Sequence, residues 1–408
     1  MSILDPLDVM MNKDRVVPYF QAIVSADKQL VVGYEVLARF QTENGVESLG
    51  WFFQDKAIPD EYRFEIQEHL QKLAITKYLQ SNQSSILFFN NDIDLLLKDD
   101  GESLLETLNP FLKKGLREDQ IVIEFKEEEI LDKVEECKHL LAYLQSLGIR
   151  IAIDNVGQSN SNLERIAMLS PNIVKVDTGF LENNSLPHLY REVHHSLSML
   201  SRKIGATLLF EGVSTFNQLN YAWRNGGRYY QGFYMGMPKD DFIEEDSCKE
   251  RLQKEFQHFI TFERKKMEAQ LTLTNDLSLQ IKQTMKRIEA DDTYDEVVTK
   301  IAEDCSDYAF RIYVCNQDGF QLSSNIEKDP NGHWSLLEEG RYKNWSWRPY
   351  FLENIVRMNV EKRGILSDLY ADIEKEEHIR TYSYPISGDA FVFVDIPYTF
   401  LFEQNDLL

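Results

Sequence analysis

A carboxylate and an amide stand side by side where a short apolar run ends, and these residue types could do chemistry. The run Ile151-Ala152-Ile153 has the character of a buried strand, and it leads into Asp154, Asn155 and then Gly157. An ionised carboxylate at the end of an apolar strand is costly to desolvate unless a metal ion or a charged partner compensates it. We therefore expect Asp154 to coordinate a cation or to form an ion pair.

Similar polar residues end other apolar runs in the first 240 residues. They are Glu35 with Arg39, Asn90, Glu124, Asp154 with Asn155, Lys175 with Asp177, Glu211, and Gln231. Taken singly, Glu35 could pair with Arg39 and Lys175 with Asp177. Buried charges are rare, so their recurrence at the ends of successive strands favours a common site. Four oxygen ligands without thiolate or imidazole suit Mg²⁺, Mn²⁺ or Ca²⁺ better than zinc.

Such a cation site would suit the chemistry of a phosphate ligand. One ion would polarise a phosphoryl oxygen, and a second could lower the pKa of an attacking water. Lys175 could orient that water or offset developing charge. The bound cations would then allow an acidic protein to hold an anionic ligand.

The elements that must position these residues follow an alternating pattern. Apolar runs alternate with longer helical stretches, which is typical of a parallel sheet with crossover helices. The runs are 20–24, 31–37, 86–89, 121–125, 149–153, 173–176, 207–210 and 229–234. Eight runs predict a closed (β/α)₈ barrel, although an open doubly wound sheet fits the number almost as well. Functional residues on many strands favour closure, because an open sheet concentrates its site at one switch point.

The length and net charge of the chain limit the number of domains and the classes of ligand. A chain of 408 residues suits two domains. The net charge of −23 disfavours general binding to nucleic-acid polymers or anionic membranes. We see neither a secretory leader nor a membrane span, and expect a soluble, cytoplasmic protein.

The middle of the chain lacks helix-breaking residues. No Gly lies between Gly236 and Gly319, and apolar residues recur there at spacings of three and four. We expect a barrel domain over 1–245, a connecting helix over 246–289 that could break near 272–275, and a small α+β sensor-like domain over 290–408. The apolar stripe of the helix should pack on a partner domain or a second chain, and we expect a homodimer.

Several motifs of the barrel region occur together in one known family. The stretch Gly33-Tyr34-Glu35-Val36-Leu37-Ala38-Arg39 resembles the opening motif of EAL domains, the bacterial cyclic di-GMP phosphodiesterases, with Val36 in place of Ala. The other matching segments are Gln21 to Val24, Phe89-Asn90, Glu124 to Glu127, Asp154 to Gly157, Lys175 to Asp177, Glu211 to Ser214, and Gln231 to Pro238. Together they span about 19–240, and the rest of the chain resembles the type in which a PAS-like domain follows the barrel.

The resemblance implies a modified TIM barrel that binds cyclic di-GMP and, in active members, hydrolyses it to pGpG with two Mg²⁺ or Mn²⁺ ions. It implies a first metal on Glu35, Asn90, Glu124 and Asp154, with catalytic roles for Glu211, near the second metal, and Lys175, near the hydrolytic water. It also implies that the ligand lies along Gln21, Leu37, Arg39, Asp177, Gln231 and Pro238. Ca²⁺ would occupy the site without supporting catalysis.

Departures from the family pattern bear on catalysis. Asn155 replaces an Asp that serves the second metal, and an amide lacks the negative charge to hold a weakly bound dication. Lys126 replaces a Thr, and its charge would disfavour a cation if it points inward. Ser214 replaces a Glu, and the loop 157–162 also differs from the family.

We therefore expect binding of cyclic di-GMP with one divalent ion and weak or absent hydrolysis. One alternative is an active phosphodiesterase gated by its C-terminal domain. Another is an interaction module whose pocket binds nothing. The C-terminal domain would receive a small ligand or a protein partner, which the sequence does not name.

Overall fold

A computed structural model describes residues 4–81, 83–157, 162–182, 188–372 and 377–403. Most of the predicted loop 157–162 therefore lies outside the described residues. The chain divides into two compact units, Met1–Gln257 and His258–Leu408, and each is described by itself.

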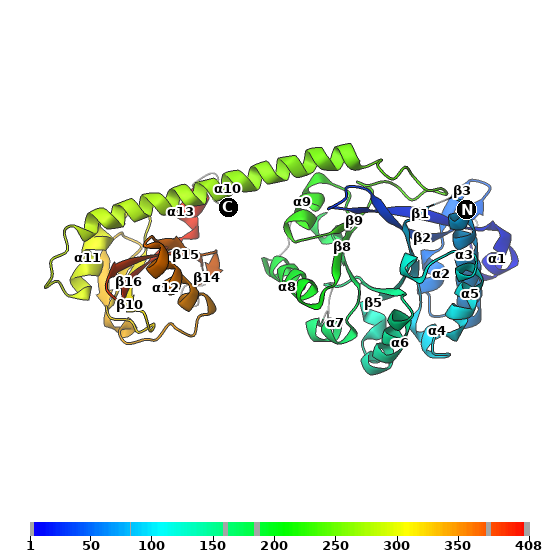
Figure 1. The fold of residues 1–408 in the computed structure, drawn as a ribbon, viewed down its shortest axis with the longest axis horizontal. Coiled ribbons are helices and arrows are strands. Elements are labelled where there is room, and N and C mark those ends of the chain that lie inside the picture. Colours follow the sequence, from blue (N-terminus) through cyan, green and yellow to red (C-terminus); the bar gives the residue numbers. More distant parts are fainter. Residues whose placement is uncertain (1–3, 82, 158–161, 183–187, 373–376, 404–408) are drawn as a thin grey trace. The chain divides into compact units, whose positions relative to one another are not determined.

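The first unit is built on a closed barrel (Figure 1). Its sheet runs in the order β1-β9-β8-β7-β6-β5-β4-β2-β3, and the pairing of β1 with β2 closes a ring of eight strands. The strands are β1 (Val16–Ser25), β2 (Val31–Thr42), β3 (Gly45–Ser48), β4 (Ile86–Asn90), β5 (Ile121–Lys126), β6 (Arg150–Asp154), β7 (Ile173–Asp177), β8 (Thr207–Glu211) and β9 (Tyr229–Gln231). The eight predicted runs and the closed barrel are thus confirmed.

Strand β1 departs from the parallel sheet that the sequence pattern predicted. It pairs antiparallel with both β2 and β9, whereas the other barrel strands are parallel. Only residues 26–30 separate β1 from β2, which is too short for a crossover helix and sufficient for a hairpin. The resulting register places Gln21 opposite Glu35 and Ile23 opposite Gln231.

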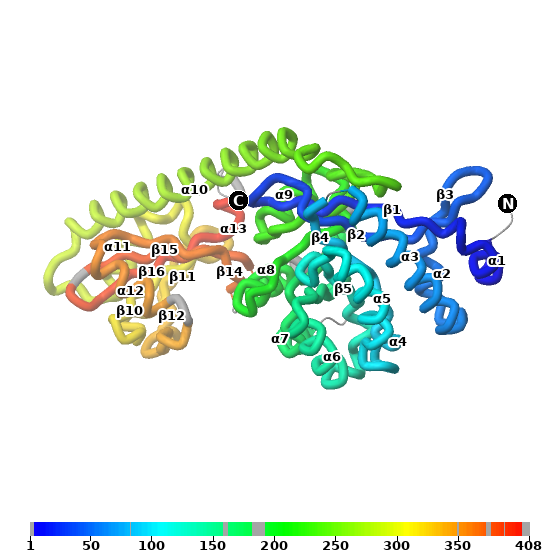
Figure 2. Tube along the Cα trace, turned by 45° about the vertical axis from the view of Figure 1, so that its right-hand side comes forward, coloured from blue at the N-terminus to red at the C-terminus, as the bar shows by residue number. Residues whose placement is uncertain are grey.

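Helices surround this barrel on its outside (Figures 1 and 2). They are α1 (Pro6–Met11), α2 (Gly50–Gln54), α3 (Asp60–Gln80), α4 (Ile93–Leu97), α5 (Glu102–Leu112), α6 (Val134–Ser146), α7 (Leu163–Leu169), α8 (His188–Ile204) and α9 (Phe216–Arg224), with short 3₁₀ turns at Lys13–Arg15, Glu118–Gln120, Glu127–Ile130 and Gly179–Glu182. The barrel interior is filled by apolar side chains, among them Phe88, Val122 and Leu209, which are fully buried. The strands therefore enclose a packed core, and chemistry is left to their ends.

Helix α10 (Lys249–Met285) is continuous, so the break that we left open near 272–275 does not occur. The hydroxyls of Thr272 and Thr274 bond the backbone carbonyls four residues earlier, at 2.9 and 2.7 Å, which accommodates both residues within the helix. Leu252 and Phe256 of the predicted stripe are buried, and Leu277 and Ile281 belong to the core of the second unit.

The second unit is an α+β domain, as predicted. Its antiparallel sheet runs in the order β12-β11-β10-β16-β15-β13, and β14 also pairs with β15. Its elements after α10 are α11 (Tyr294–Asp304), β10 (Arg311–Asn316), β11 (Asn325–Lys328), β12 (Trp334–Leu337), a 3₁₀ turn (Glu338–Gly340), α12 (Pro349–Glu361), β13 (Ile365–Leu366), β14 (Tyr370–Ala371), β15 (His378–Ser387), β16 (Ala390–Pro397) and α13 (Tyr398–Glu403). Most of its described aromatic residues serve as core, for example Tyr382 and Phe391.

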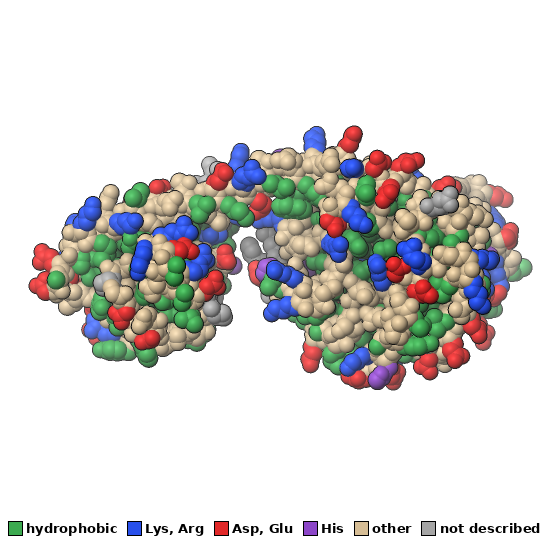
Figure 3. Space-filling model, viewed as in Figure 1, with side chains coloured by type: hydrophobic (Ala, Val, Ile, Leu, Met, Phe, Trp, Pro, Cys, Tyr) green, Lys and Arg blue, Asp and Glu red, His purple; other side chains and the backbone are tan. Residues whose placement is uncertain are grey.

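The surface carries both signs of charge. Acidic and basic side chains are interspersed over the face of the barrel unit that Figure 3 shows. Among the described residues, no helix has the length and apolarity that crossing a membrane requires.

Candidate functional site

The carboxyl ends of the parallel strands bring the predicted polar residues into neighbouring positions. The register pairs Asn90 with Glu124 across β4 and β5, and Lys126 with Asp154 across β5 and β6. It also pairs Asp177 with Glu211 across β7 and β8. Because parallel strands end on the same rim of a barrel, residues dispersed over 120 positions of sequence meet there.

Lys175 is the centre of this arrangement. Its ammonium is fully buried and lies among four carboxylates. The distances from Nζ are 3.1 Å to Glu124, 3.1 Å to Glu211, 3.4 Å to Glu35 and 3.6 Å to Asp154. The alternative in which Lys175 pairs with Asp177 is not among the ion pairs of the described residues. If all four carboxylates are ionised, one ammonium leaves three negative charges uncompensated.

The surroundings shift the pKa values of this cluster in different directions. Burial raises the pKa of Glu211 to about 8 and that of Glu124 well above its usual range, although Lys175 opposes both shifts. At Glu35 burial acts in the same direction, but Lys175 and hydrogen bonds from Gln231 and Asn90 outweigh it and lower the pKa. Burial would lower the pKa of Lys175, and the four carboxylates instead raise it well above its usual value. Lys175 is therefore a fixed positive charge.

Several buried acceptor atoms of the cluster lack a hydrogen bond. Within the described ranges these include Oε1 of Glu124, Oδ1 of Asp154 and Oε1 of Gln231. Oε1 of Glu124 and Oδ1 of Asp154 instead face the Lys175 ammonium, 3.1 and 3.6 Å from Nζ, and a hard cation is another partner that carboxylate oxygens prefer. The residues therefore fit a divalent ion, with Glu35, Glu124, Asp154 and the Asn90 amide as its ligands.

The cluster is not already arranged as a metal cage. Across the part of the chain that the structure describes, no group of three or more His, Cys, Asp and Glu side chains is gathered as metal ligands. We attribute this to Lys175, which stands among the carboxylates, and to the hydrogen bond of 2.6 Å that Asn90 donates to Glu35. A bound ion would have to compete with these contacts.

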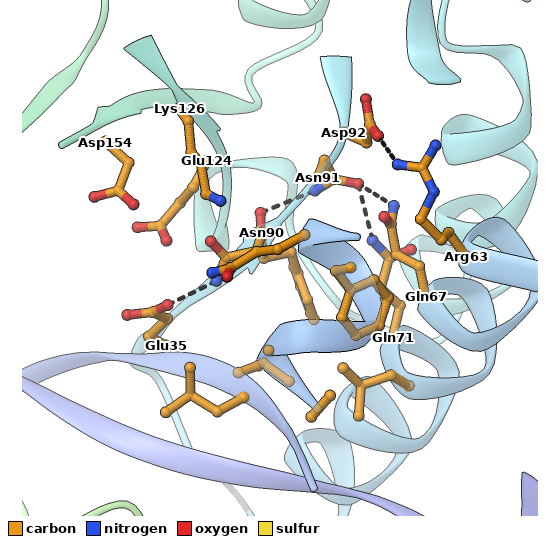
Figure 4. A pocket seen from close by; sticks show the side chains of 18 of the residues that line it. Glu35, Arg63, Gln67, Gln71, Asn90, Asn91, Asp92, Glu124, Lys126 and Asp154 are labelled. Atoms are coloured by element: carbon orange, nitrogen blue, oxygen red, sulfur yellow. Dashed lines mark hydrogen bonds and ion pairs between the residues drawn. The ribbon is translucent and has the colours of Figure 1, made fainter. Parts of the chain in front are cut away.

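A cavity of about 290 Å³ opens beside this cluster. Figure 4 shows Glu35, Asn90, Glu124 and Asp154 at one side of it. Among the predicted ligand residues, Leu37 and Arg39 also line it. Arg39 donates hydrogen bonds to the Ala38 carbonyl and to Ser48, and burial lowers its pKa.

Other predicted residues lie outside the lining of this cavity. Gln231 is linked to it through hydrogen bonds to Glu35 and to Gln21. Asp177 accepts a hydrogen bond from the backbone of Gly179 at 2.8 Å, and Ser214 donates to the Gly212 carbonyl at 3.2 Å. Like these residues, Pro238 does not line the cavity.

The two departures next to the predicted metal ligands both line the cavity. Asn155 has a left-handed backbone, with φ of 59°, and its amide donates to Asp154 at 3.2 Å. Asn and Asp both tolerate this conformation better than most residues. Figure 4 shows the Lys126 side chain directed toward the side of the cavity that holds Glu124 and Asn90. The open question about Lys126 is thereby answered, because it points inward.

Sequence reasoning missed the opposite wall of the cavity. Arg63, Gln67 and Gln71 of α3 are buried and line it together with Asn91. Their signal in the sequence was weak, since polar residues that recur at every fourth position of α3 are also typical of a solvated helix face. Glu129 was also missed; it lines the cavity, and burial raises its pKa to about 7.

Comparison with known proteins then decides the family. The family model described as EAL domain matches residues 5–238, and the model of an EAL-domain associated signalling protein domain, YkuI_C, matches residues 242–408. The chain belongs to the EAL-domain family. The resemblance that its motifs predicted is confirmed.

Full-length relatives extend this match to the whole chain. The uncharacterised EAL-domain containing protein YkuI of Bacillus subtilis (strain 168) is 44% identical over 407 residues, which cover 99% of this chain and 100% of the relative. The crystal structure of that YkuI with cyclic di-GMP and calcium matches with a TM-score of 0.94, again over 99% of this chain and 100% of that one.

More distant EAL proteins match only part of the chain. The probable cyclic di-GMP phosphodiesterase PdeN of Escherichia coli (strain K12) is 30% identical over 126 residues, which cover 30% of this chain and 24% of PdeN. A complex of Klebsiella pneumoniae BlrP1 with manganese and cyclic di-GMP matches at 25% identity with a TM-score of 0.50, over 57% of this chain and 58% of that chain.

Proposed function

We propose that the EAL domain of this chain binds cyclic di-GMP together with one divalent ion, and hydrolyses it weakly or not at all. The observation that carries the proposal is the joint position of Glu35, Asn90, Glu124 and Asp154 at one cavity, where the three carboxylates share the ammonium of Lys175. The YkuI complex with cyclic di-GMP and calcium supports the same reading, since YkuI is 44% identical over nearly the whole chain.

Residues of the chain would contact the phosphates of cyclic di-GMP and also the parts of the ligand on either side of them. Arg39 lines the cavity and presents a planar guanidinium that suits a phosphate. Leu37 offers apolar contact, while Gln21, Asp177, Gln231 and Pro238 would lie along the rest of the ligand. An ion bound by the four ligands would polarise a phosphoryl oxygen.

Weak hydrolysis is proposed from two residues that line the cavity. Asn155 supplies an amide where a second carboxylate would strengthen the hold on a second cation. Lys126 adds a positive charge within the same space, which opposes a further dication. Ser214 is a third departure, but it lies outside the cavity lining. One strongly and one weakly held ion would support binding better than turnover.

Lys175 and Glu211 favour the second candidate, an active phosphodiesterase gated by the C-terminal domain. Lys175 Nζ lies 3.1 Å from a carboxylate oxygen of Glu211, and Lys175 is a permanent cation that could offset charge on a reacting phosphate. Under this alternative, the C-terminal domain would receive a small ligand or a protein and alter the cavity.

We also propose that the protein acts as a homodimer. Helix α10 exposes several large apolar side chains, including Phe262, Met267 and Leu271. Exposed apolar side chains on one long helix are typical of an interface. Light scattering at micromolar concentration should give twice the mass of the chain, and a monomeric mass would contradict the dimer.

Titration calorimetry tests the binding proposal. Cyclic di-GMP is titrated into the full chain with Ca²⁺, with Mg²⁺ and with a chelator. We expect micromolar or tighter binding with either ion and a loss of at least tenfold with the chelator. Absence of binding under every condition would favour the interaction module with a non-binding pocket.

A further inference from the structure

The two faces of the sheet in the C-terminal domain are packed differently. One face, which includes Val314 and Val394, packs on α10 and α11 in a largely aliphatic core. The opposite face presents the aromatic rings of Tyr313 and Phe393, and α12 covers it with Phe351. Side chains alternate between the two faces along each strand, so neighbouring residues of one strand enter different surroundings. A small cavity of about 10 Å³ lies between the aromatic face and α12.

Polar side chains of this cavity lack a partner. The side chains of Tyr313, which is 5% exposed, and Ser383, which is 3% exposed, make no hydrogen bond with the described residues, and neither does Asn354 of α12. Neither hydroxyl is among the fully enclosed atoms that lack a partner, so both oxygens border open space. In the same lining, Thr381 is satisfied because it donates to Asp395 at 2.6 Å. Unpaired hydroxyls at the wall of a cavity require water or a ligand.

The positive charge of this lining comes from Arg348. Its guanidinium lies over the ring of Trp345, 4.4 Å from the ring centroid, and a stacked guanidinium directs its N–H groups sideways. Trp345 is held in turn, because its Nε1 donates to Gln321 at 3.0 Å. Arg348 also opposes the rise that burial causes in the pKa of Tyr313, so the guanidinium and this hydroxyl interact electrostatically.

The charges around the cavity favour an anion. Asp395, which pairs with Thr381 across the sheet, is already compensated, since its two oxygens accept from Arg311 and from Thr381. Aromatic rings can hold a cation, but Arg348 already lies on the face of Trp345 and would repel a second one. Helix α12 also begins here with Arg348 as its N-cap residue, and the N-terminus of a helix favours negative charge.

We infer that this cavity binds the carboxylate of a small aliphatic monocarboxylic acid, such as acetate or propionate. The hydroxyls of Tyr313 and Ser383 would donate to one carboxylate oxygen each, and Arg348 would pair with the charge. The short apolar tail would contact Phe351 and Phe393. A carboxylate needs more room than about 10 Å³, so Arg348, a long and half-buried side chain, would move outward to admit it. A nucleotide or a sugar is far too large.

Saturation-transfer NMR on the full chain tests this inference with acetate, propionate and acetamide, while sodium chloride keeps the ionic strength constant. Acetamide has the shape of acetate without its charge. We expect saturable transfer to the methyl groups of both acids and an affinity for acetamide that is lower by roughly 10-fold or more. Equal affinity for acetate and acetamide would overturn the inference. Absence of saturable transfer to either acid would also overturn it, because the cavity would then hold water only.

Substitution locates the site, since Arg39 at the barrel rim could also attract an acid. Arg348→Gln should weaken acetate binding by roughly 10-fold or more. Arg357→Gln is the matched control, because Arg357 belongs to the same helix but pairs with Glu353 and Glu361 outside the cavity. This control and Arg39→Gln should both keep the affinity for acetate. Retention in Arg348→Gln with loss in Arg39→Gln would move the site to the rim and overturn the inference.

A second variant keeps the test decisive where Arg348→Gln does not fold, as judged by circular dichroism. Tyr313→Phe with Ser383→Ala removes both hydroxyls, retains Arg348, and should weaken acetate binding by roughly 10-fold. An unchanged affinity for acetate in this variant would overturn the inference. The site belongs to the C-terminal domain, so these outcomes do not depend on whether the barrel binds cyclic di-GMP.

Discussion

Each unit of this protein buries a positive charge among carboxylates, and the two clusters differ in how completely their atoms are bonded. In the barrel, Lys175 faces four carboxylates, and buried oxygens of Glu124 and Asp154 accept no hydrogen bond from the described residues. In the C-terminal domain, Arg311 pairs with Asp372 and Asp395. Counted over these described partners, the charge balance is −3 in the first cluster and −1 in the second, if every carboxylate is ionised.

The cluster around Arg311 is closed by hydrogen bonds. Its Nε donates to Asp395 at 2.7 Å, the other oxygen of Asp395 accepts from Thr381 at 2.6 Å, and Tyr370 bonds Thr381 at 2.6 Å. Burial raises the pKa of Asp395, and Arg311 opposes that shift. A satisfied network of this kind specifies a fold, whereas the incomplete network around Lys175 indicates a ligand.

Removing the central cation should have the largest effect and should separate the two clusters. Lys175→Met and Arg311→Met each leave buried carboxylates without a counter-charge, and we expect each to lower the free energy of unfolding by about 3–5 kcal/mol. Millimolar Mn²⁺ or Ca²⁺ should restore part of the loss in Lys175→Met, because an ion can replace the ammonium. It should restore nothing in Arg311→Met.

Urea denaturation with and without the divalent ion measures both variants. Equal rescue of both variants would show that the difference between the clusters has no bearing on cation binding. Absence of rescue in Lys175→Met would show that the carboxylates hold no ion even when they are uncompensated.

Metal binding by the wild type should have a smaller effect. At an ion concentration of 100 times Kd, binding to the folded state stabilises it by about 2.7 kcal/mol. Glu124→Gln should abolish most of this gain, because Glu124 provides buried oxygens to the site. Asp395→Asn is the matched control, since it alters a buried carboxylate of the other cluster. Thermal melts with Ca²⁺ that shift both variants equally would contradict the assignment of Glu124.

The pH dependence of the metal-free protein provides a third comparison. Burial raises the pKa of Glu211 from 4.5 to about 8, so between pH 5 and 8 the folded protein keeps a proton that the unfolded chain has lost. The free energy of unfolding of metal-free protein should therefore fall as the pH rises through this window. The lowered pKa of Glu35 affects the free energy of unfolding only below about pH 4.5.

Urea denaturation at pH 5, 6, 7 and 8 measures this slope. Glu211→Gln should make it shallower, because the substitution removes the titrating group. A saturating divalent ion should also reduce it, since the ion keeps carboxylates ionised in the folded state. A stability that rises between pH 5 and 8 in the chelated wild type would contradict the pKa assigned to Glu211.

Much of the barrel could be predicted from sequence because its information is local. Apolar runs of four to seven residues marked all eight strands, and polar residues within or directly after most runs marked the rim, as at Glu124 and Asp154. The antiparallel direction of β1 could have been inferred from the five residues that separate it from β2. The number of strands does not reveal this direction, because it is the same whether β1 runs parallel or antiparallel to its neighbours.

Other features depend on tertiary contacts that a sequence pattern does not contain. Lys175 pairs with four carboxylates from four other strands, not with the nearby Asp177, because the closed barrel brings those strands around it. The opposite wall of the cavity was missed for a related reason. Gln67 and Gln71 resemble ordinary polar helix residues until the fold places Asn91 against them.

The central claim is that the ligand is bound but turned over slowly, and product analysis tests it most directly. Wild type and Asn155→Asp are incubated side by side with Mn²⁺ and cyclic di-GMP, and pGpG is measured over time. The substitution suits the left-handed backbone at this position, since Asp tolerates it as Asn does. We expect the wild type to leave most of the substrate intact and Asn155→Asp to gain hydrolysis. Multiple rapid turnovers to pGpG by the wild type would contradict the account.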